Sequence, residues 1–278
     1  MSYETLMVQL ELGRSNSAPL AVVRDIAKRM GAVVSGIGAA QPIQTALAAE
    51  GYYGGDIIRE DTSAIEAEGG IAEKEFCAAL AGYADRPDWT LVMTRYPLSE
   101  RIAHAAGNTD LMVVGIAQAG DDKAGLSRRV DIDDLVMRTG RPVLAVPLGV
   151  DHFSFRCAVV AWKNSREARR ALADALPLLR NMNRVVLVEV TSVPEQEVAQ
   201  ADLAKMVAWL GRHGIEASSR LVTAMGNDGD RLVAVAEEEG ADLIVAGAYG
   251  HSRFREWVMG GVTRTLLHAG GRCVLLSH

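Results

Sequence analysis

"DLIVAGAYGHSRFREWVMGGVTRTLLHAGGRCVLLSH", residues 242–278, decides the fold because both of its ends recur earlier in the chain. "DLMVVG" at 110–115 resembles the "DLIVAG" that opens this stretch, and "GRPVLAVP" at 140–147 resembles the "GRCVLLSH" that closes it. Two matches in the same order indicate a duplicated unit rather than two isolated coincidences.

The spacing of the two matches supports the duplication. Asp110 and Gly140 are separated by 30 positions, and Asp242 and Gly271 by 29 positions. We therefore expect two copies of one domain, each of about 140 residues, which is a common domain size.

The length of the chain agrees with this division. A chain of 278 residues favours two domains. "VPLGVDHFSF" at 146–155 contains a proline and a glycine, which are typical of a connection between structured segments. The predicted domains are residues 1–149 and 150–278.

Short β-rich runs alternate with helical patterns in the second half. Strands are expected at 157–162, 185–190, 217–222, 242–247 and 273–276, and the last two helices at 229–240 and 262–269. Leu172, Leu176 and Leu179 recur at helical spacing after Ser165, which stands where an N-cap is expected. This alternation predicts a parallel sheet with helices on both faces, an α/β fold.

The first half follows the same plan less clearly. Strands are expected at 6–12, 32–37, 90–94, 110–115 and 142–147. The stretch 39–69 carries "GYYGG" and acidic residues, and we expect a longer, partly irregular insertion there, such as a helix plus a loop.

Composition argues against several functions. The formal net charge of -6 disfavours nucleic acid as the main partner, since phosphate binding needs clustered Lys and Arg. No apolar run approaches the roughly 20 residues of a membrane helix, and the first residues lack the pattern of a signal peptide. The three cysteines form no CxxC pair, so neither a zinc site nor a disulfide framework is expected. We expect a cytoplasmic protein that binds neither nucleic acid nor membrane.

The glycine-rich loop after the strand 242–247 is the strongest candidate for a ligand site. In an open parallel sheet, ligands lie beyond the carboxyl ends of the strands, where the strand order reverses. Gly247 and Gly250 would let backbone approach a ligand and adopt positive φ, and Gly260 and Gly261 precede a helical stretch. Free N–H groups at a helix start favour an anion such as phosphate. The simpler interpretation is a tight turn plus a close helix–sheet contact.

Gly247-x2-Gly250-x9-Gly260, followed by a small residue, resembles the nucleotide motif of the universal stress protein family. The repeat and the order of strands and helices are also similar to that family, over nearly the whole chain as two tandem domains. The resemblance implies, for each domain, a five-stranded parallel sheet in the order 3-2-1-4-5. Its ATP-binding members hold the phosphates with this loop and the adenosine near the ends of the first two strands.

The resemblance implies one site for ATP or ADP, with or without Mg²⁺, in the second domain only. The loop and helix start would line the phosphates and ribose through Gly247, Gly250, His251, Ser252, Gly260, Gly261, Val262 and Thr263. Ala161, Trp162 and Lys163 would lie near the adenosine, and Val190 could meet the adenine through its backbone.

Two positions of the second half depart from the family pattern. The family usually has Ser or Thr after the third motif glycine, where this chain has Gly261. The family usually has an acidic residue after the first strand, where this chain has Lys163. Lys163 could meet a phosphate, or it could point into solvent as a surface lysine.

The first half departs further, because the motif glycines are missing after Gly115. Asp131, Asp133 and Asp134 occupy the region that matches Val262–Thr265. Three carboxylates suit a helix start but repel phosphate, so we expect no nucleotide in the first half. Acidic capping of a helix is the favoured interpretation, and a divalent cation site is the alternative. The first half would pack on the second as an internal pseudo-dimer, in a chain that could also form a homodimer.

Catalytic motifs are missing from the sequence. GxSxG and HExxH are absent, His251 has no adjacent carboxylate, and His268 is expected to be a structural or surface residue. We therefore expect no catalytic residue and at most slow ATP hydrolysis. The favoured function is a nucleotide-dependent sensor or partner-binding switch in a stress response. The alternatives are a scaffold protein without nucleotide, and a slow ATPase.

Overall fold

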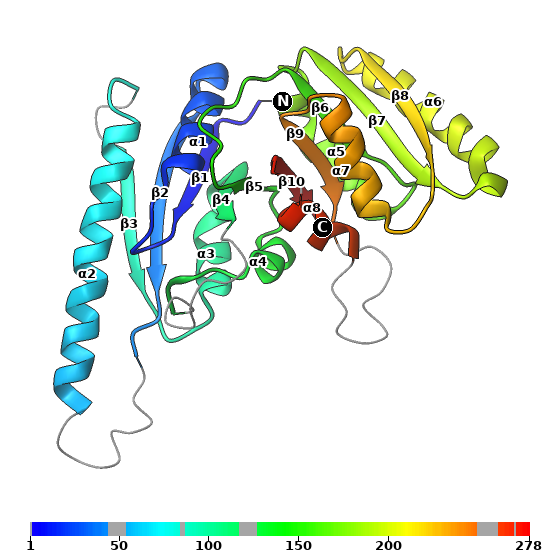
Figure 1. Cartoon of the computed structure of the whole chain (residues 1–278). Helices are drawn as coiled ribbons and strands as arrows, with labels where there is room; N and C mark the ends of the chain where they lie inside the picture. Colours follow the sequence, from blue (N-terminus) through cyan, green and yellow to red (C-terminus); the bar gives the residue numbers. More distant parts are fainter. Residues whose placement is uncertain (1, 44–53, 84–86, 117–126, 249–260, 270) are drawn as a thin grey trace.

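The structure is a computed structural model that describes residues 2–43, 54–83, 87–116, 127–248, 261–269 and 271–278. Its ten strands form one sheet, and helices cover both faces (Figure 1). The α/β class with a mostly parallel sheet is confirmed. The expectation of a separate sheet in each domain is corrected, because the last strands of the two halves pair with each other.

The first half contributes β1 to β5 and the second half β6 to β10. Their bounds are β1 Thr5–Leu10, β2 Val33–Ala40, β3 Asp88–Met93, β4 Leu111–Ile116, β5 Val143–Pro147, β6 Cys157–Ala161, β7 Arg184–Thr191, β8 Ala217–Thr223, β9 Leu243–Gly247 and β10 Cys273–Ser277. The central strands are apolar and buried on both faces, as a sheet covered by helices on both sides requires.

The strand order is β3-β2-β1-β4-β5-β10-β9-β6-β7-β8. Counted from its own first strand, each half reads 3-2-1-4-5. Neighbouring strands are parallel within each half, and β5 with β10 is the antiparallel pair. The order reverses between β1 and β4 and between β6 and β9. Ligand sites of open α/β sheets lie at the carboxyl ends of such strand pairs.

The β5–β10 pair joins the two halves edge to edge near the middle of the molecule (Figure 1). Leu144 lies opposite Leu275, and both are fully buried. The repeats at 140–147 and 271–278 make these two residues equivalent, so an approximate two-fold axis passes between them. The first half therefore packs against the second through equivalent strands.

Helices cover the sheet in two layers. Their bounds are α1 Ser17–Met30, α2 Gly54–Ala79, α3 Leu98–Ala105, α4 Ile132–Thr139, α5 Arg166–Leu179, α6 Gln196–Arg212, α7 Asp228–Glu238 and α8 Gly261–Ala269. One core contains residues of α1, α2, α5 and α6, and the other contains residues of α3, α4, α7 and α8. Each half thus places its first two helices on one face and its last two on the other.

Side-chain caps start several of these helices. The Ser165 hydroxyl accepts a hydrogen bond from the Ala168 N–H at 3.2 Å, which confirms the predicted N-cap of α5. Asp131 caps α4 in the same way, accepting from the Asp134 N–H at 3.0 Å. The carboxylate at the start of α4 thus has the capping role that the sequence favoured.

The stretch 39–69 contains the expected helix, because α2 is helical from residue 54 onward, and β2 extends into the stretch as far as Ala40. Residues 44–53 lie outside the described part. Ile65, Ala72 and Phe76 recur at helical spacing and bury one face of α2. Gly69 allows close packing, since a Cβ there would come within 2.6 Å of the Leu91 side chain on β3.

The connection between β5 and β6 packs against α1. The rings of Phe153 and Phe155 meet edge to face with centroids 4.7 Å apart. The Phe153 N–H donates to the Asp25 carboxylate at 2.9 Å, and the Arg29 guanidinium lies 5.7 Å from the Phe155 ring centroid. We retain residues 149 and 150, within this connection, as the proposed domain boundary.

Candidate functional site

The candidate site lies at the carboxyl ends of β6 and β9, where the strand order of the second half reverses. Ala161 ends β6 and pairs with Ala246 on β9 and Val188 on β7. β7 continues to Thr191, so Val190 lies beyond the end of β6. The structure therefore brings the predicted residues Ala161 and Val190 to one edge of the sheet.

Trp162 follows β6 directly and is buried. Its backbone N–H donates to the Val188 carbonyl at 2.8 Å, which extends the ladder by one residue. Its indole Nε1 has no hydrogen-bond partner within the described residues. A buried donor without a partner is costly, so this N–H is available to a ligand acceptor or to water.

Lys163 is exposed and carries its charge between two carboxylates. Burial raises the pKa of Glu189 and the Lys163 ammonium partly offsets this, whereas hydrogen bonds from Ser192 and Thr191 lower the pKa of Glu195 and Lys163 adds to that effect. The sequence allowed two interpretations of Lys163, a phosphate contact or a surface lysine in solvent. Both require an exposed side chain, and the side chain is exposed.

Glu189 is a site residue that the sequence reasoning missed. Its side chain is buried on β7, and its Oε2 has no hydrogen-bond partner in the described part of the chain. Burial raises its pKa, Asp202 raises it further, and Lys163 partly offsets the two. The sequence does contain one indication of Glu189, a single acidic residue within the apolar run 185–190. Carboxylates are rarely buried unless they are paired, so such a residue is a candidate for a functional site.

Gly247 has a packing reason to be glycine. A Cβ at this position would lie 2.5 Å from the Glu167 carbonyl carbon and 2.6 Å from the Ala168 nitrogen, in the first turn of α5. Its φ lies outside the left-handed region, which corrects the expectation of positive φ. The close helix–sheet contact therefore explains this glycine without a ligand.

The end of the chain borders the same edge. Ser277 on β10 pairs with Gly247, and its buried hydroxyl has no hydrogen-bond partner among the described residues. The Ala248 N–H donates to the Ser277 carbonyl at 2.8 Å, and His278 Nδ1 lies 3.0 Å from the Ala248 carbonyl oxygen. Sequence reasoning missed Ser277, because a serine near a chain end carries no pattern.

Glu167 in the first turn of α5 is buried beside this edge. Burial opposes its ionisation, but hydrogen bonds from its own backbone and from Ser165, with the charges of Arg166 and His278, outweigh burial and lower its pKa. An ionised carboxylate therefore stands behind Gly247, on the α5 side.

The helix start predicted to meet phosphate is at α8. Gly261 opens the helix, and a Cβ there would meet none of the described residues within 4 Å. Val262 is half-buried and Thr263 is buried. Because the first N–H groups of a helix lack intrahelical partners, the backbone of these residues is what α8 can offer an anion. Gly250, His251, Ser252 and Gly260 lie outside the described residues.

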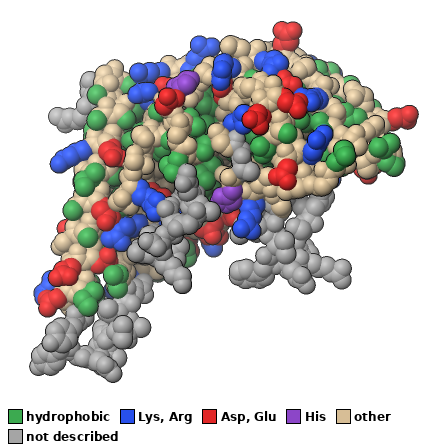
Figure 2. Space-filling view, in the orientation of Figure 1, with side chains coloured by type: hydrophobic (Ala, Val, Ile, Leu, Met, Phe, Trp, Pro, Cys, Tyr) green, Lys and Arg blue, Asp and Glu red, His purple; other side chains and the backbone are tan. Residues whose placement is uncertain are grey.

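Other site types gain no support. No cluster of three or more His, Cys, Asp or Glu side chains in the described part could hold a metal ion. Acidic and basic side chains are intermixed on the face shown in Figure 2, without an extended basic patch. Within the described ranges, no helix combines the length and apolarity needed to span a bilayer.

Comparison with solved structures shows that the fold is shared over both halves. A universal stress protein from Archaeoglobus fulgidus superposes with a TM-score of 0.73 at 17% identity, covering 100% of this chain and 99% of that chain. A protein assigned to the same family from Pseudomonas aeruginosa gives a TM-score of 0.61 at 13% identity, covering 99% and 93%. At these identities the likeness concerns the fold alone.

Comparison with curated protein sequences gave no match. The model of the universal stress protein family matches residues 155–275, which contain β6 to β9, the glycine loop, α8 and most of β10. The second half therefore matches the universal stress protein family in sequence, and both halves share the fold of solved universal stress proteins.

Proposed function

We propose that this protein acts in a stress response by binding one adenine nucleotide, ATP or ADP, at the carboxyl edge of its second half. Nucleotide occupancy would switch the protein between states that differ in partner binding. The proposal includes the cytoplasmic location expected from the sequence, and it assigns no nucleotide to the first half.

The start of α8 carries the proposal. The chain leaves β9 at Gly247, at the point where strand order reverses, and enters α8 at Gly261, where a Cβ would meet none of the described residues within 4 Å. A helix N-terminus reached through a glycine-rich loop is well suited to an anion, since its N–H groups and dipole both favour negative charge.

The residues at the strand ends support a nucleoside beside these phosphates. Ala161 and Val190 would contact the base, and the indole N–H of Trp162 and the Glu189 carboxyl are buried polar groups without partners in the described part. The exposed ammonium of Lys163 would face a phosphate. Mg²⁺, if bound, would be held by the phosphates. No catalytic residue is assigned, and any ATP hydrolysis would be slow.

Calorimetric titration of ATP, ADP and AMP into nucleotide-stripped protein tests the proposal. We expect binding near one site per chain, and its loss in a folded Gly250→Val, Gly260→Val variant. Gly70→Val is the matched control, since a Cβ at Gly70 on α2 meets nothing within 4 Å. Absence of binding by the unmodified chain would refute the nucleotide site.

A scaffold function without nucleotide is the second candidate. One observation in its favour is that close packing against α5 already explains why residue 247 is a glycine. Another is that Lys163 and Gly261 depart from the family pattern. In that case the titration gives no heat, and the Gly250→Val, Gly260→Val variant differs from the unmodified chain only in stability.

A further inference from the structure

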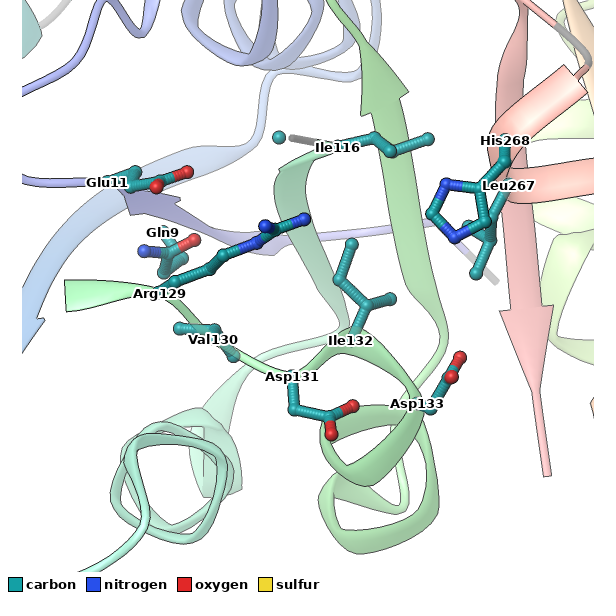
Figure 3. Close-up of a pocket in the computed structure, with 11 residues that line it drawn as sticks. Gln9, Glu11, Ile116, Arg129, Val130, Asp131, Ile132, Asp133, Leu267 and His268 are labelled. Atoms are coloured by element: carbon teal, nitrogen blue, oxygen red, sulfur yellow. The ribbon is translucent and has the colours of Figure 1, made fainter. Parts of the chain in front are cut away.

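A cavity of about 270 Å³ lies at the carboxyl ends of β1 and β4, where the strand order of the first half reverses. Its walls come from both halves, because Leu267 and His268 of α8 close the side opposite β1 (Figure 3). Ligand pockets are usually about 300–1,000 Å³, so this cavity suits a ligand smaller than a nucleotide.

Gln9 lines the cavity and is an unusual residue for its strand. It is 4% exposed on β1, between apolar neighbours, and its Nε2 has no hydrogen-bond partner in the described part of the chain. Leaving a buried amide donor unpaired costs about 1–3 kcal/mol. Figure 3 shows the amide oxygen on the cavity side, and a half-turn of the amide would present Nε2 to a ligand acceptor there and remove this cost.

Arg129 reaches into the same cavity from the chain segment before α4 (Figure 3). Its neighbour Arg128 has a structural role, with its guanidinium 3.2 Å from Asp61 and 2.5 Å from Glu68. Arg129 is half-buried and makes no ion pair with a described residue. A guanidinium beside an amide donor is a suitable pair for a carboxylate.

The other side of the cavity has the opposite character. Asp133, in the first turn of α4, lies across the cavity from Gln9 and Arg129, with Ile132 between them and Ile116 above (Figure 3). Carboxylate oxygens accept from an ammonium group, and the apolar side chains between the two charged ends would contact a hydrocarbon group.

From this arrangement we propose that the cavity binds a small zwitterion, an α-amino acid with an apolar side chain. Its carboxylate would lie against Arg129 and Gln9, its ammonium against Asp133, and its side chain against Ile116, Ile132 and Leu267. A phosphate ester is disfavoured, because its net negative charge would meet the carboxylates of Glu11 and Asp131 as well as Asp133, whereas a zwitterion carries no net charge. The proposal is independent of nucleotide binding in the second half.

Saturation-transfer NMR on the full chain tests the ligand class with three related probes. L-leucine carries both charges, 4-methylpentanoate lacks the amine, and 3-methylbutylamine lacks the carboxylate. We expect leucine to bind and each truncated probe to bind at least about tenfold more weakly. The proposal fails if leucine, valine, isoleucine and methionine all show no binding at millimolar concentration, or if 4-methylpentanoate binds as tightly as leucine.

Three variants test the residues, each checked for folding by circular dichroism. Arg129→Met should abolish leucine binding and leave the weak binding of 3-methylbutylamine unchanged. Asp133→Asn should abolish leucine binding and leave 4-methylpentanoate unchanged. Arg212→Met, which removes an exposed arginine at the end of α6, is the matched control and should bind leucine normally. Equal losses of both truncated probes in either cavity variant would indicate a structural role and overturn the assignment.

Discussion

The carboxyl edges of β1 and β6 are equivalent places in the two halves, and they carry opposite charges. Gln9 pairs with Val114 as Ala161 pairs with Ala246, so the register makes Gln9 equivalent to Ala161 and Glu11 equivalent to Lys163. The first half thus has an acid after its first strand, where the second half has a base. The family resemblance leads us to expect an acid there, so the half that lacks the glycine loop retains the acid.

The helices after the fourth strands differ in the same way. The repeat aligns Asp131 with Val262 and Asp133 with Arg264, so carboxylates surround the start of α4 and are absent from the first residues of α8. One duplicated fold therefore presents an edge suited to a phosphate and an edge that disfavours one. If the two proposed sites are correct, the fold positions a ligand edge in each half, and side chains on two short segments select the ligand.

The contact between the halves should give the largest effect. Leu144→Ala and Leu275→Ala each remove a fully buried side chain at the β5–β10 pair, and each should lower the free energy of unfolding by about 2–5 kcal/mol. The two losses should agree closely, because the two residues face each other at the two-fold axis. Urea unfolding measures both. If one variant lost only the stability of its own half, the sheet would not couple the halves.

Placing the first half's carboxylate in the second half tests the charge contrast directly. Val262→Asp reproduces Asp131 at the start of α8 and should weaken ATP binding at least about 100-fold, roughly 2.7 kcal/mol, through repulsion of the phosphates. The helix itself tolerates this acid, since carboxylates are favourable in a first turn.

Val262→Asn is the uncharged control and should retain most of the affinity. Calorimetry measures binding and thermal unfolding measures stability. Equal losses in the Asp and Asn variants would show that the valine side chain, and not the charge, controls the site.

Equivalent glycines separate packing from ligand binding. Gly247→Ala would place a Cβ 2.5 Å from backbone of α5 and should cost about 1–3 kcal/mol of stability. Gly115→Ala, at the matching position of the first half, meets Pro19 Cγ at 3.6 Å and should be nearly neutral. Thermal or urea unfolding of the two variants gives the comparison. Similar values for both would contradict the close contact described for Gly247.

Much of the fold could be predicted from the sequence, because apolar runs such as "DLIVAG" and "VVLVEV" predict buried strands whatever their partners. The pairing of β5 with β10 could not, since a strand buried on both faces carries no pattern that names its neighbour at the edge. A helix plus a loop was expected in the 39–69 stretch, but the bounds of the helix could not be predicted. The buried residues of this helix, Ile65, Ala72 and Phe76, are separated by acidic residues, which obscures the apolar pattern. Of the three, only Ile65 lies within 39–69.

The candidate site could be predicted only in part. The strand-end positions Ala161, Trp162 and Val190 follow from the family resemblance, and the structure brings them to one edge. The polar groups of Glu189 and Ser277 required the structure, because burial and the lack of a partner arise from the packing of α5, α6 and β10. Nucleotide binding itself stays a prediction.

The departure at Gly261 offers the finest test of the contrast between the two edges. Gly261→Ser restores the hydroxyl that the family usually has, and we expect it to fit without strain, because a Cβ there would meet none of the described residues within 4 Å. One added hydrogen bond to phosphate is worth about 0.5–1.5 kcal/mol, so ATP should bind about two- to tenfold more tightly. Gly261→Ala is the control, because it gives at least as large a gain in helix propensity without the hydroxyl. If both variants gain equally, the improvement comes from a more stable start of α8. If Ser alone gains, Gly261 weakens a phosphate site that the rest of the edge still provides, and the second half is a nucleotide domain tuned to lower affinity. If neither changes binding, the phosphates do not approach Gly261, and the anion-binding role of the α8 start is wrong.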